Sequence, residues 1–266
     1  MRVAVITDVH GNLGALEAVL AHIRRQGVDQ TVVAGDTVNI SPHSKACWDL
    51  VRSLGCPVLK GNHELYIYTY DTPEADPAWT QERFQGLAWV RSQFSADDLN
   101  AMRQLPLTYA LPDLLITHAS PRSVFDSVDE TTPVEELKEM FAPAGFIVRG
   151  HNHSWLERRW QDRTLVTVAS CGLPLKGRLE AQYALLTKED RWRYEKQFVP
   201  YDRDAALASM DAHYMEMMGP LGHIFKRELA TGRNYLLPFL FENLTAIDQG
   251  EVTLANAVEH FLAQRA

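Results

Sequence analysis

The feature that most constrains this chain is a set of five short polar motifs, each directly after a run of apolar, mostly β-branched residues. The motifs are Asp8-Val9-His10, Gly35-Asp36, Gly61-Asn62-His63-Glu64, Thr117-His118 and Gly150-His151-Asn152-His153. A motif with three fixed letters arises by chance in roughly one chain of this length in thirty, so a single match means little. Five matches, each supplying residue types that bind divalent cations, are much harder to obtain by accident.

The first third of the chain alternates between strand-like and helix-like segments. We predict strands at residues 3–7, 31–34 and 57–60, and helices at residues 13–25 and 44–54. Strands that alternate with helices at these lengths pair in parallel through right-handed crossovers. Ligands bind such sheets beyond the carboxyl ends of the strands, which is where every motif falls.

Residues 66–111 break this alternation and are predicted to form a helical insertion over the active edge of the sheet, with helices at residues 81–94 and 96–105. Beyond it we predict strands at residues 114–117, 146–149, 165–169, 183–187 and 191–199, the last two joined by a hairpin. Helices then dominate, at residues 205–218 and 254–264 among others. We therefore expect a domain of residues 1–200 that contains the insertion, with a helical C-terminal extension of residues 201–266 packed on it.

Composition narrows the possible partners. At 266 residues the chain can bury a full core. A net charge of -8 without a long Lys/Arg run argues against polymeric nucleic acid as the main partner. No apolar stretch approaches the roughly 20 residues of a membrane span, so no membrane association is expected.

The first residues and the cysteines indicate a cytoplasmic protein. The predicted first strand begins near Met1, which leaves no room for a cleaved signal. The three cysteines, Cys47, Cys56 and Cys171, are odd in number and lack CxxC spacing, so we expect reduced thiols.

The motif residues suit a transition-metal centre. Residues two apart in a strand point the same way, so Asp8 and His10 can bind one cation, and His151 and His153 can face a common site. Carboxylate, imidazole and amide ligands favour manganese, iron or zinc over magnesium or calcium. The two carboxylate oxygens of Asp36 could bridge two cations.

Two ions about 3.5 to 4 Å apart would bind the attacking and leaving oxygens of a phosphoryl group and lower the pKa of a bridging water. His63 is left without a metal in this scheme. Its expected role is to donate a proton to the leaving oxygen.

These residues resemble the calcineurin-like metallophosphoesterase superfamily, whose pattern is D-x-H, G-D, G-N-H-D/E, H and G-H-x-H, over about residues 1–200. The resemblance implies an α+β fold, a four-layer α/β/β/α sandwich of two mixed β-sheets with flanking helices. It also implies two ligand sets, one of Asp8, His10, Asp36 and His153 and the other of Asp36, Asn62, His118 and His151.

The stretch after Asp36 departs from the protein-phosphatase and diadenosine tetraphosphatase branches, because it lacks the Arg that helps to hold phosphate there. It resembles the compact bacterial and archaeal phosphodiesterase-like branch. Arg122 is then the candidate phosphate clamp, and Asn62 a second substrate contact; a surface salt bridge is the alternative for Arg122. Residues 168–171 replace an Asn-Pro-Gly-Ser turn that is common in that branch.

Other residues have more ordinary interpretations. The remaining histidines are expected to be structural or surface residues: His22, His43, His213, His223 and His260. Asn12 is expected to cap the first helix, and Arg149 to be structural. One group of aromatic residues either belongs to the core or stacks on a nucleobase near the site: Tyr66, Tyr68, Tyr70, Trp79 and Trp89.

The sequence predicts a phosphoesterase that depends on two divalent ions and hydrolyses a small or nucleotide-like phosphodiester or phosphomonoester through a metal-bridging hydroxide. Manganese is the first candidate ion, followed by iron, zinc, cobalt and nickel. The alternatives are a dinucleoside polyphosphate hydrolase or protein-phosphatase-like enzyme, and a metal-binding interaction scaffold. The complete ligand set, with His63, favours an enzyme. The oligomeric state stays open, a homodimer being one option.

Overall fold

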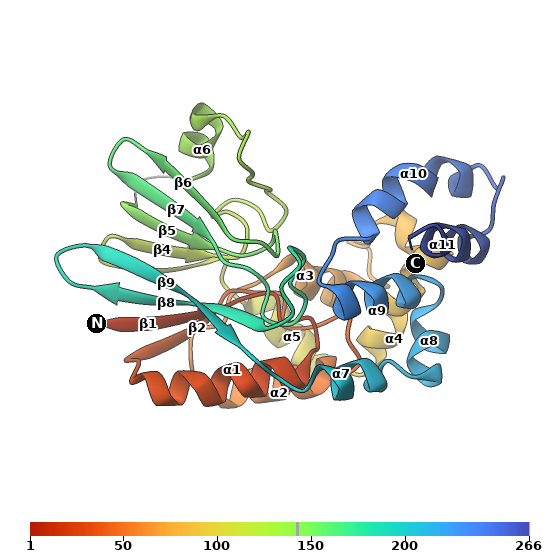
Figure 1. The fold of residues 1–266 in the computed structure, drawn as a ribbon, viewed down its shortest axis with the longest axis horizontal. Coiled ribbons are helices and arrows are strands. Elements are labelled where there is room, and N and C mark those ends of the chain that lie inside the picture. The colour runs from red at the N-terminus through yellow and green to blue at the C-terminus, as the bar shows by residue number, and fades with distance from the viewer. Residues whose placement is uncertain (142–143, 266) are drawn as a thin grey trace.

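The computed structural model describes residues 1–141 and 144–265, and two β-sheets lie face to face at its centre (Figure 1). Strand order is β2-β1-β8-β9 in the first sheet and β3-β4-β5-β7-β6 in the second. The strands are β1 (Arg2–Ile6), β2 (Gln30–Val33), β3 (Thr108–Leu111), β4 (Leu114–Thr117), β5 (Phe146–Arg149), β6 (Leu156–Trp160), β7 (Arg163–Thr167), β8 (Ala181–Lys188) and β9 (Trp192–Val199).

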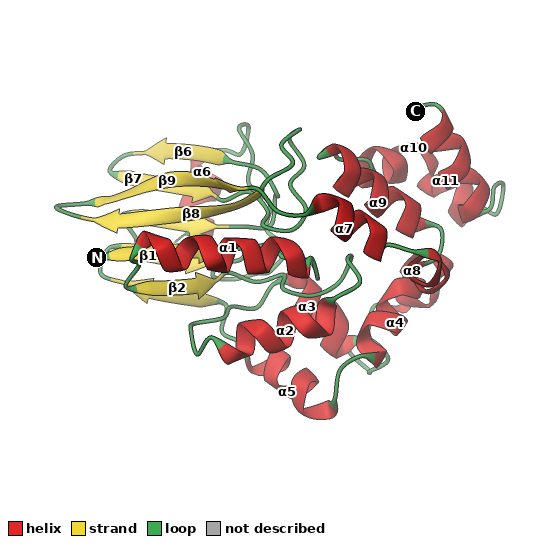
Figure 2. Cartoon of the chain, turned by 60° about the horizontal axis from the view of Figure 1, so that its bottom comes forward, coloured by secondary structure: helices red, strands yellow, loops and turns green. Residues whose placement is uncertain are grey.

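Helices flank the sheets and form the other end of the molecule (Figure 2). The α-helices are α1 (Leu13–Gln26), α2 (Ser44–Ser53), α3 (Asn62–Thr69), α4 (Gln85–Ser92), α5 (Ala96–Gln104), α6 (Val134–Met140), α7 (Arg203–Ser209), α8 (Ala212–Met218), α9 (Leu221–Thr231), α10 (Leu236–Asp248) and α11 (Leu254–Ala263). Two short 3₁₀ helices, η1 (Pro77–Thr80) and η2 (Glu82–Phe84), precede α4. Among the described residues, none of the helices combines the length and apolar character needed to cross a bilayer.

The alternation of side chains along the strands produces the layers. Val3 and Val5 lie in the buried cluster between the two sheets, whereas Ala4 and Ile6 lie in the cluster that includes α1 and α2. In the second sheet, Ile147 belongs to an outer cluster with residues of α6. Helices α1 and α2 cover one outer face and α6 the other (Figure 1), so the expected four-layer α+β sandwich is confirmed.

Parallel pairing brings the motifs to one end of the sandwich. β1 pairs in parallel with β2, and β5 pairs in parallel with both β4 and β7. The carboxyl ends of β1 and β2 therefore point the same way in one sheet, and those of β4 and β5 in the other. Four of the five motifs directly follow these strands, and their donor atoms meet in two groups that draw on both sheets.

Several predicted boundaries were wrong for identifiable reasons. Residues 57–60 do not form a strand; only Val58 pairs with β2, as an isolated bridge to Val33. Pro57 has no N–H to donate, and the Lys60 N–H donates to the Pro106 carbonyl instead of to β2. The single helix expected at residues 205–218 is two helices, since Asp211 caps the second one by accepting from Tyr214 N–H. The insertion at residues 66–111 also contains β3, at the edge of the second sheet.

The C-terminal helices contact the rest of the chain through a shared buried cluster. Tyr214 and Phe225 of this region pack in the same cluster as residues of α1, α2 and α4. The buried Tyr214 hydroxyl donates to the Ile40 carbonyl over 2.8 Å. Residue 266, the end of the predicted extension, lies outside the described residues.

One buried glutamate fixes the loop after β2 to the start of α3. Glu64 is fully buried, and its carboxylate accepts three backbone N–H groups over 2.6 to 2.8 Å, from Asp36, Thr37 and Gly61. Burial raises the pKa of Glu64, and these hydrogen bonds oppose that rise. The position of Asp36 therefore depends on a charged acceptor that can serve three donors.

We predict that Glu64→Gln lowers the free energy of unfolding by roughly 1–3 kcal/mol, because an amide NH₂ would face a buried backbone N–H. Urea denaturation of the metal-free protein measures this change. Glu17→Gln, at an exposed site on α1, is the matched control and should have almost no effect. Equal stability of the two variants would contradict the structural role of the Glu64 carboxylate.

Candidate metal centre

The loops after four strands and the first turn of α3 bring the predicted ligands into two adjoining groups. The first group contains Asp8, His10, Asp36 and His153, and the second contains Asp36, His118 and His151. Within each group, the donor atoms lie within 4.8 Å of one another. Both sheets contribute, since β1 and β2 belong to one sheet and β4 and β5 to the other.

In the first group, four electron-pair donors converge on one buried point. His10 Nε2 lies 2.8 Å from His153 Nε2, 3.8 Å from Asp36 Oδ2 and 3.9 Å from Asp8 Oδ1. His153 Nε2 is also 3.5 Å from Asp8 Oδ1. A cation at the centre of these atoms would satisfy all four donors.

The second group is joined by Asn62. Its Oδ1 atom lies 3.0 Å from His118 Nε2 and 2.9 Å from His151 Nδ1. His118 Nε2 is 3.4 Å from Asp36 Oδ2, the same oxygen that faces His10 in the first group. The other Asp36 oxygen, Oδ1, accepts the His63 backbone N–H over 2.8 Å. One oxygen of Asp36 thus faces both groups.

Backbone carbonyls orient two of the imidazoles. His118 Nδ1–H donates to the Ala34 carbonyl and His153 Nδ1–H donates to the Leu173 carbonyl, each over 2.9 Å. The lone pair of each neutral ring is therefore on Nε2 and directed into the site. Asp8 is fixed in a similar way, since its Oδ2 accepts from the Thr7 hydroxyl and the His151 N–H.

Burial keeps the imidazoles neutral and opposes ionisation of the carboxylates. It lowers the pKa of His10 and His118 well below the ordinary value, and it lowers the pKa of His151 to about 3. It also raises the pKa of Asp36, an effect to which the nearby Glu64 and Asp8 add. Neutral imidazoles are the form that binds metal, and a bound cation would stabilise the buried carboxylates. The donor set therefore fits divalent transition metals.

Five of the proposed ligands have left-handed backbone conformations. The φ angles lie between 52° and 72° for Asp8, His10, Asp36, His151 and His153. This region costs a residue other than glycine about 1–2 kcal/mol. Such strain concentrates at functional sites because the surrounding structure must hold it.

Two motif glycines allow close approach of the backbone to the ligands. A Cβ atom on Gly61 would overlap Asp36 Oδ1, and a Cβ atom on Gly150 would overlap Thr7 Oγ1 and lie 2.7 Å from Asp8 Oδ2. Neither position has room for any side chain.

His63 faces the two groups from the side. Its Nε2 atom lies 4.0 Å from Asp36 Oδ2, and its Nδ1 atom lies 2.9 Å from Asn39 Nδ2. The Asn39 oxygen is occupied, because it accepts the Ile40 N–H over 2.8 Å. The Asn39 amide therefore donates to His63 Nδ1, which places the proton of the neutral ring on Nε2.

Arg122 forms an ion pair with Asp126. Its Nε donates to Asp126 over 2.8 Å, and half of its side chain is exposed. The buried Arg149 has the structural contacts that we expected, since it donates to the carbonyls of Ala119 and Asp126 and to Asn152 Oδ1. Burial lowers the pKa of Arg149 to about 10.

The aromatic residues divide between core and site. Tyr68 and Trp79 are buried, and Trp89 packs edge-on against Tyr214. Tyr66 is only partly buried and its ring centroid lies 5.3 Å from that of His63.

Two residues near the site have no counterpart in our sequence prediction: Asn39, which contacts His63, and Phe125, whose ring packs against that of Tyr66. Both lie in loops without periodic patterning. For Asn39 the only signal was its position three residues after Asp36.

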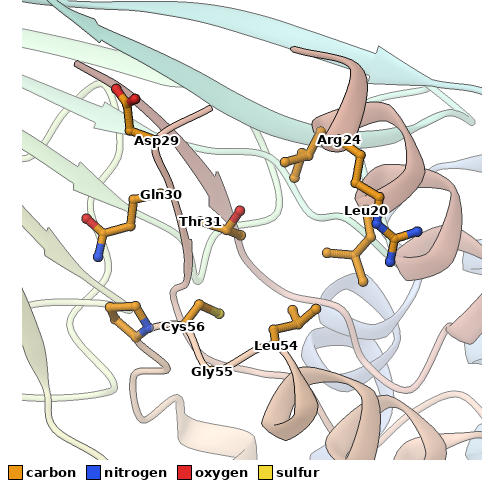
Figure 3. Close-up of a pocket in the computed structure, with 10 residues that line it drawn as sticks. Leu20, Arg24, Asp29, Gln30, Thr31, Leu54, Gly55 and Cys56 are labelled. Atoms are coloured by element: carbon orange, nitrogen blue, oxygen red, sulfur yellow. The ribbon is translucent and has the colours of Figure 1, made fainter. Parts of the chain in front are cut away.

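A hollow of about 320 Å³ elsewhere on the surface contains none of the motif residues (Figure 3). It lies between the end of α1, the start of β2 and the loop after α2, where Arg24, Gln30 and Cys56 line it. The metal centre is therefore defined by its donor atoms and not by this hollow.

Known proteins share both the motifs and the fold. The calcineurin-like phosphoesterase pattern matches residues 1–178. A metallophosphoesterase from Sphaerobacter thermophilus is 25% identical, with a TM-score of 0.72 over 87% of this chain and all of that one.

Two archaeal proteins extend the comparison. A hypothetical protein from Pyrococcus horikoshii has the same fold, with 18% identity and a TM-score of 0.72 over 88% of this chain and 99% of that one. An uncharacterised protein of Methanocaldococcus jannaschii is 24% identical over 75% of this chain and 88% of its own length. Because the family pattern covers most of the sandwich and every motif, the chain belongs to the calcineurin-like phosphoesterase family and is a metal-dependent phosphoester hydrolase.

Proposed function

We propose that this enzyme uses two divalent ions to hydrolyse a small or nucleotide-like phosphodiester or phosphomonoester. The observation that carries the proposal is the position of Asp36 Oδ2, which lies 3.8 Å from His10 Nε2 in one group and 3.4 Å from His118 Nε2 in the other. A carboxylate oxygen between two donor groups can bridge a pair of ions. The bridge would use Oδ2 alone and not both oxygens as the sequence suggested, since Oδ1 accepts the His63 N–H.

Each group would hold one ion. The first ion would be held by Asp8, His10, Asp36 and His153, and the second by Asp36, Asn62, His118 and His151. When bound, the ions supply Lewis acidity to the phosphoryl oxygens and lower the pKa of a water between them. The mixed nitrogen and oxygen donors suit manganese, iron, zinc, cobalt or nickel, and manganese is the first ion to test.

His63 would act as the proton donor. The hydrogen bond from Asn39 leaves the imidazole proton on Nε2, the atom that faces the site. Burial lowers the pKa of His63 to about 3, so the neutral ring is the form that carries this proton at neutral pH. A neutral imidazole that is held in place can protonate the departing alkoxide as the phosphorus–oxygen bond breaks.

A small ester is a better substrate candidate than a dinucleoside polyphosphate or a phosphoprotein. No Arg follows Asp36 to hold a further phosphate, and Arg122 could act as a clamp only by leaving Asp126. The presence of His63 beside a complete donor set favours an enzyme over a metal-binding scaffold.

We also propose a cytoplasmic location for the enzyme. All three cysteines are free thiols, and burial raises the pKa of Cys47 and Cys171, which suits a reducing compartment. The net charge of -8 favours a small substrate over polymeric nucleic acid.

Substitution of a ligand that belongs to one group should remove only the ion of that group. Substitution of Asp36, which both groups share, should affect both ions. We expect two Mn²⁺ ions per chain in the wild type, one in His10→Ala and one in His118→Ala, because each histidine faces only one group. Asp36→Asn should bind less than one ion, since both groups share that carboxylate. Equilibrium dialysis followed by elemental analysis measures the ratio. A wild-type plateau at one ion, or two ions in Asp36→Asn, would exclude the bridged pair.

Loss of His63 should matter most for poor leaving groups. His63→Ala should keep both ions and slow the hydrolysis of alkyl esters by about 10² to 10⁴. Nitrophenyl esters should lose much less, because their leaving group needs little protonation. Steady-state kcat for both ester types, with the metal content of each sample, tests this. His22→Ala is the control, since His22 contacts Tyr183 on the outside of the first sheet.

Equal loss for both ester types would show that His63 does not donate the proton. Loss of an ion from His63→Ala would instead show that this residue ligates or positions a metal.

A further inference from the structure

Phe125 is an exposed aromatic ring on a loop that is held rigidly beside the metal centre. Its side chain is 49% exposed, one of a few large apolar side chains on the surface. Arg149 fixes the loop by donating to the Ala119 and Asp126 carbonyls on either side of it. Ser120 adds a hydrogen bond to the Asp126 carboxylate over 2.6 Å. The ring is therefore held at the surface by polar contacts of the loop.

The ring lies next to residues of the site. The Phe125 and Tyr66 centroids are 5.9 Å apart with a tilt of 35°, and Tyr66 packs edge-on against His63 with centroids 5.3 Å apart. Trp79 also packs edge-on against Tyr66, with centroids 5.4 Å apart. Phe125 therefore contacts Tyr66, and Tyr66 contacts the proposed proton donor His63.

We propose that Phe125 and Tyr66 form an aromatic subsite that binds a planar ring in the leaving group of the substrate. The inference rests on the proposed function, because the proton donor His63 defines the leaving-group side and Tyr66 contacts His63. The ligand class is a phosphoester that carries a nucleobase or an aryl ring close to its phosphorus.

The chemistry of the subsite fits such a ring. Aromatic pairs prefer offset or edge-to-face contacts, which an exposed ring can make without moving its neighbours. Every nucleobase and aryl group has a π face, so stacking selects for planarity and not for hydrogen-bonding pattern. Tyr66 lies on α3 one turn after Asn62, so the subsite adjoins the second donor group.

Two other exposed apolar side chains, Leu237 and Phe241, lie on a different part of the surface from His63 and Tyr66. Leu237 and Phe241 are 64% and 93% exposed, but both lie on α10, at the opposite end of the molecule from the sheets (Figure 1). Phe241 is therefore a matched control for Phe125, because the same substitution can be made at an exposed ring outside the site.

The subsite can be tested by binding, with the non-hydrolysable phosphonate analogue in place of any ligand below that the enzyme hydrolyses. Isothermal titration of the Mn²⁺-loaded protein would compare three phosphate ligands: adenosine 5′-monophosphate, phenyl phosphate and ribose 5-phosphate. We expect the wild type to bind the adenosine ligand about tenfold more tightly than ribose 5-phosphate. A similar gain for phenyl phosphate would identify a general aryl subsite, and no gain would identify a nucleobase subsite.

The variants separate stacking from general apolar contact. Phe125→Ala should abolish the preference for the ring-bearing ligand, Phe125→Tyr should retain it, and Phe125→Leu should retain only part of it. Phe241→Ala should bind all three ligands as the wild type does. The inference is overturned if the wild type shows no preference, or if Phe125→Ala keeps the preference in full.

Failure of the subsite and failure of the proposed function give different results. Wild-type protein that hydrolyses bis(p-nitrophenyl) phosphate but shows no ring preference would retain the proposed function and overturn the subsite. Absence of hydrolysis with every metal tried would overturn the proposed function, and the titrations would still decide whether Phe125 binds a planar ring.

Discussion

The metal centre depends on the packing of the two sheets against each other. Val3 and Val5 of one sheet bury their side chains against Phe146 and Val148 of the other, and the ligands emerge where these strands end. Burial of apolar surface at about 25 cal/mol per Å² holds the sheets together but does not fix their relative position. Directional contacts across the interface supply that precision.

Hydrogen bonds between the sheets fix their relative position. The His151 N–H donates to Asp8, and the His118 ring donates to the Ala34 carbonyl, so each sheet orients a ligand of the other. The absence of a side chain at Gly150 allows this approach, since a Cβ atom would overlap Thr7. A shift of the sheets by even 1 Å would break these contacts and separate the donors of each group.

Residues just after the strands have strained, left-handed backbone conformations that direct the metal ligands toward one another. Among the described residues, ten that are not glycine have positive φ angles, and seven of these belong to the motifs or to the loop after Asp36. Each turns the chain sharply after a strand, so that neighbouring ligands point inward instead of following the sheet. The cost of about 1–2 kcal/mol for each residue is offset by buried hydrogen bonds such as those to Glu64.

The sequence was informative wherever local pattern and motif coincided. The bounds of β4 and β5 were predicted correctly, because each is a short apolar run that ends at a motif. β6 was missed because Glu157, Arg158 and Arg159 mask its alternation at the sheet edge. Asn39 and Phe125 could not be identified, since their positions depend on contacts between loops that are far apart in the sequence.

The C-terminal helices have a direct connection to the site that the sequence pattern could not reveal. Tyr214 of α8 donates to the Ile40 carbonyl, and the Ile40 N–H in turn occupies the oxygen of Asn39. That contact orients the Asn39 amide, which donates to His63 and leaves the proton of the ring on the side of the metal ligands. Both Asn39 and Ile40 have positive φ angles, so the loop needs support to keep this conformation. A buried tyrosine about 150 residues beyond His63 is therefore part of the structure that fixes the tautomer of the proposed proton donor.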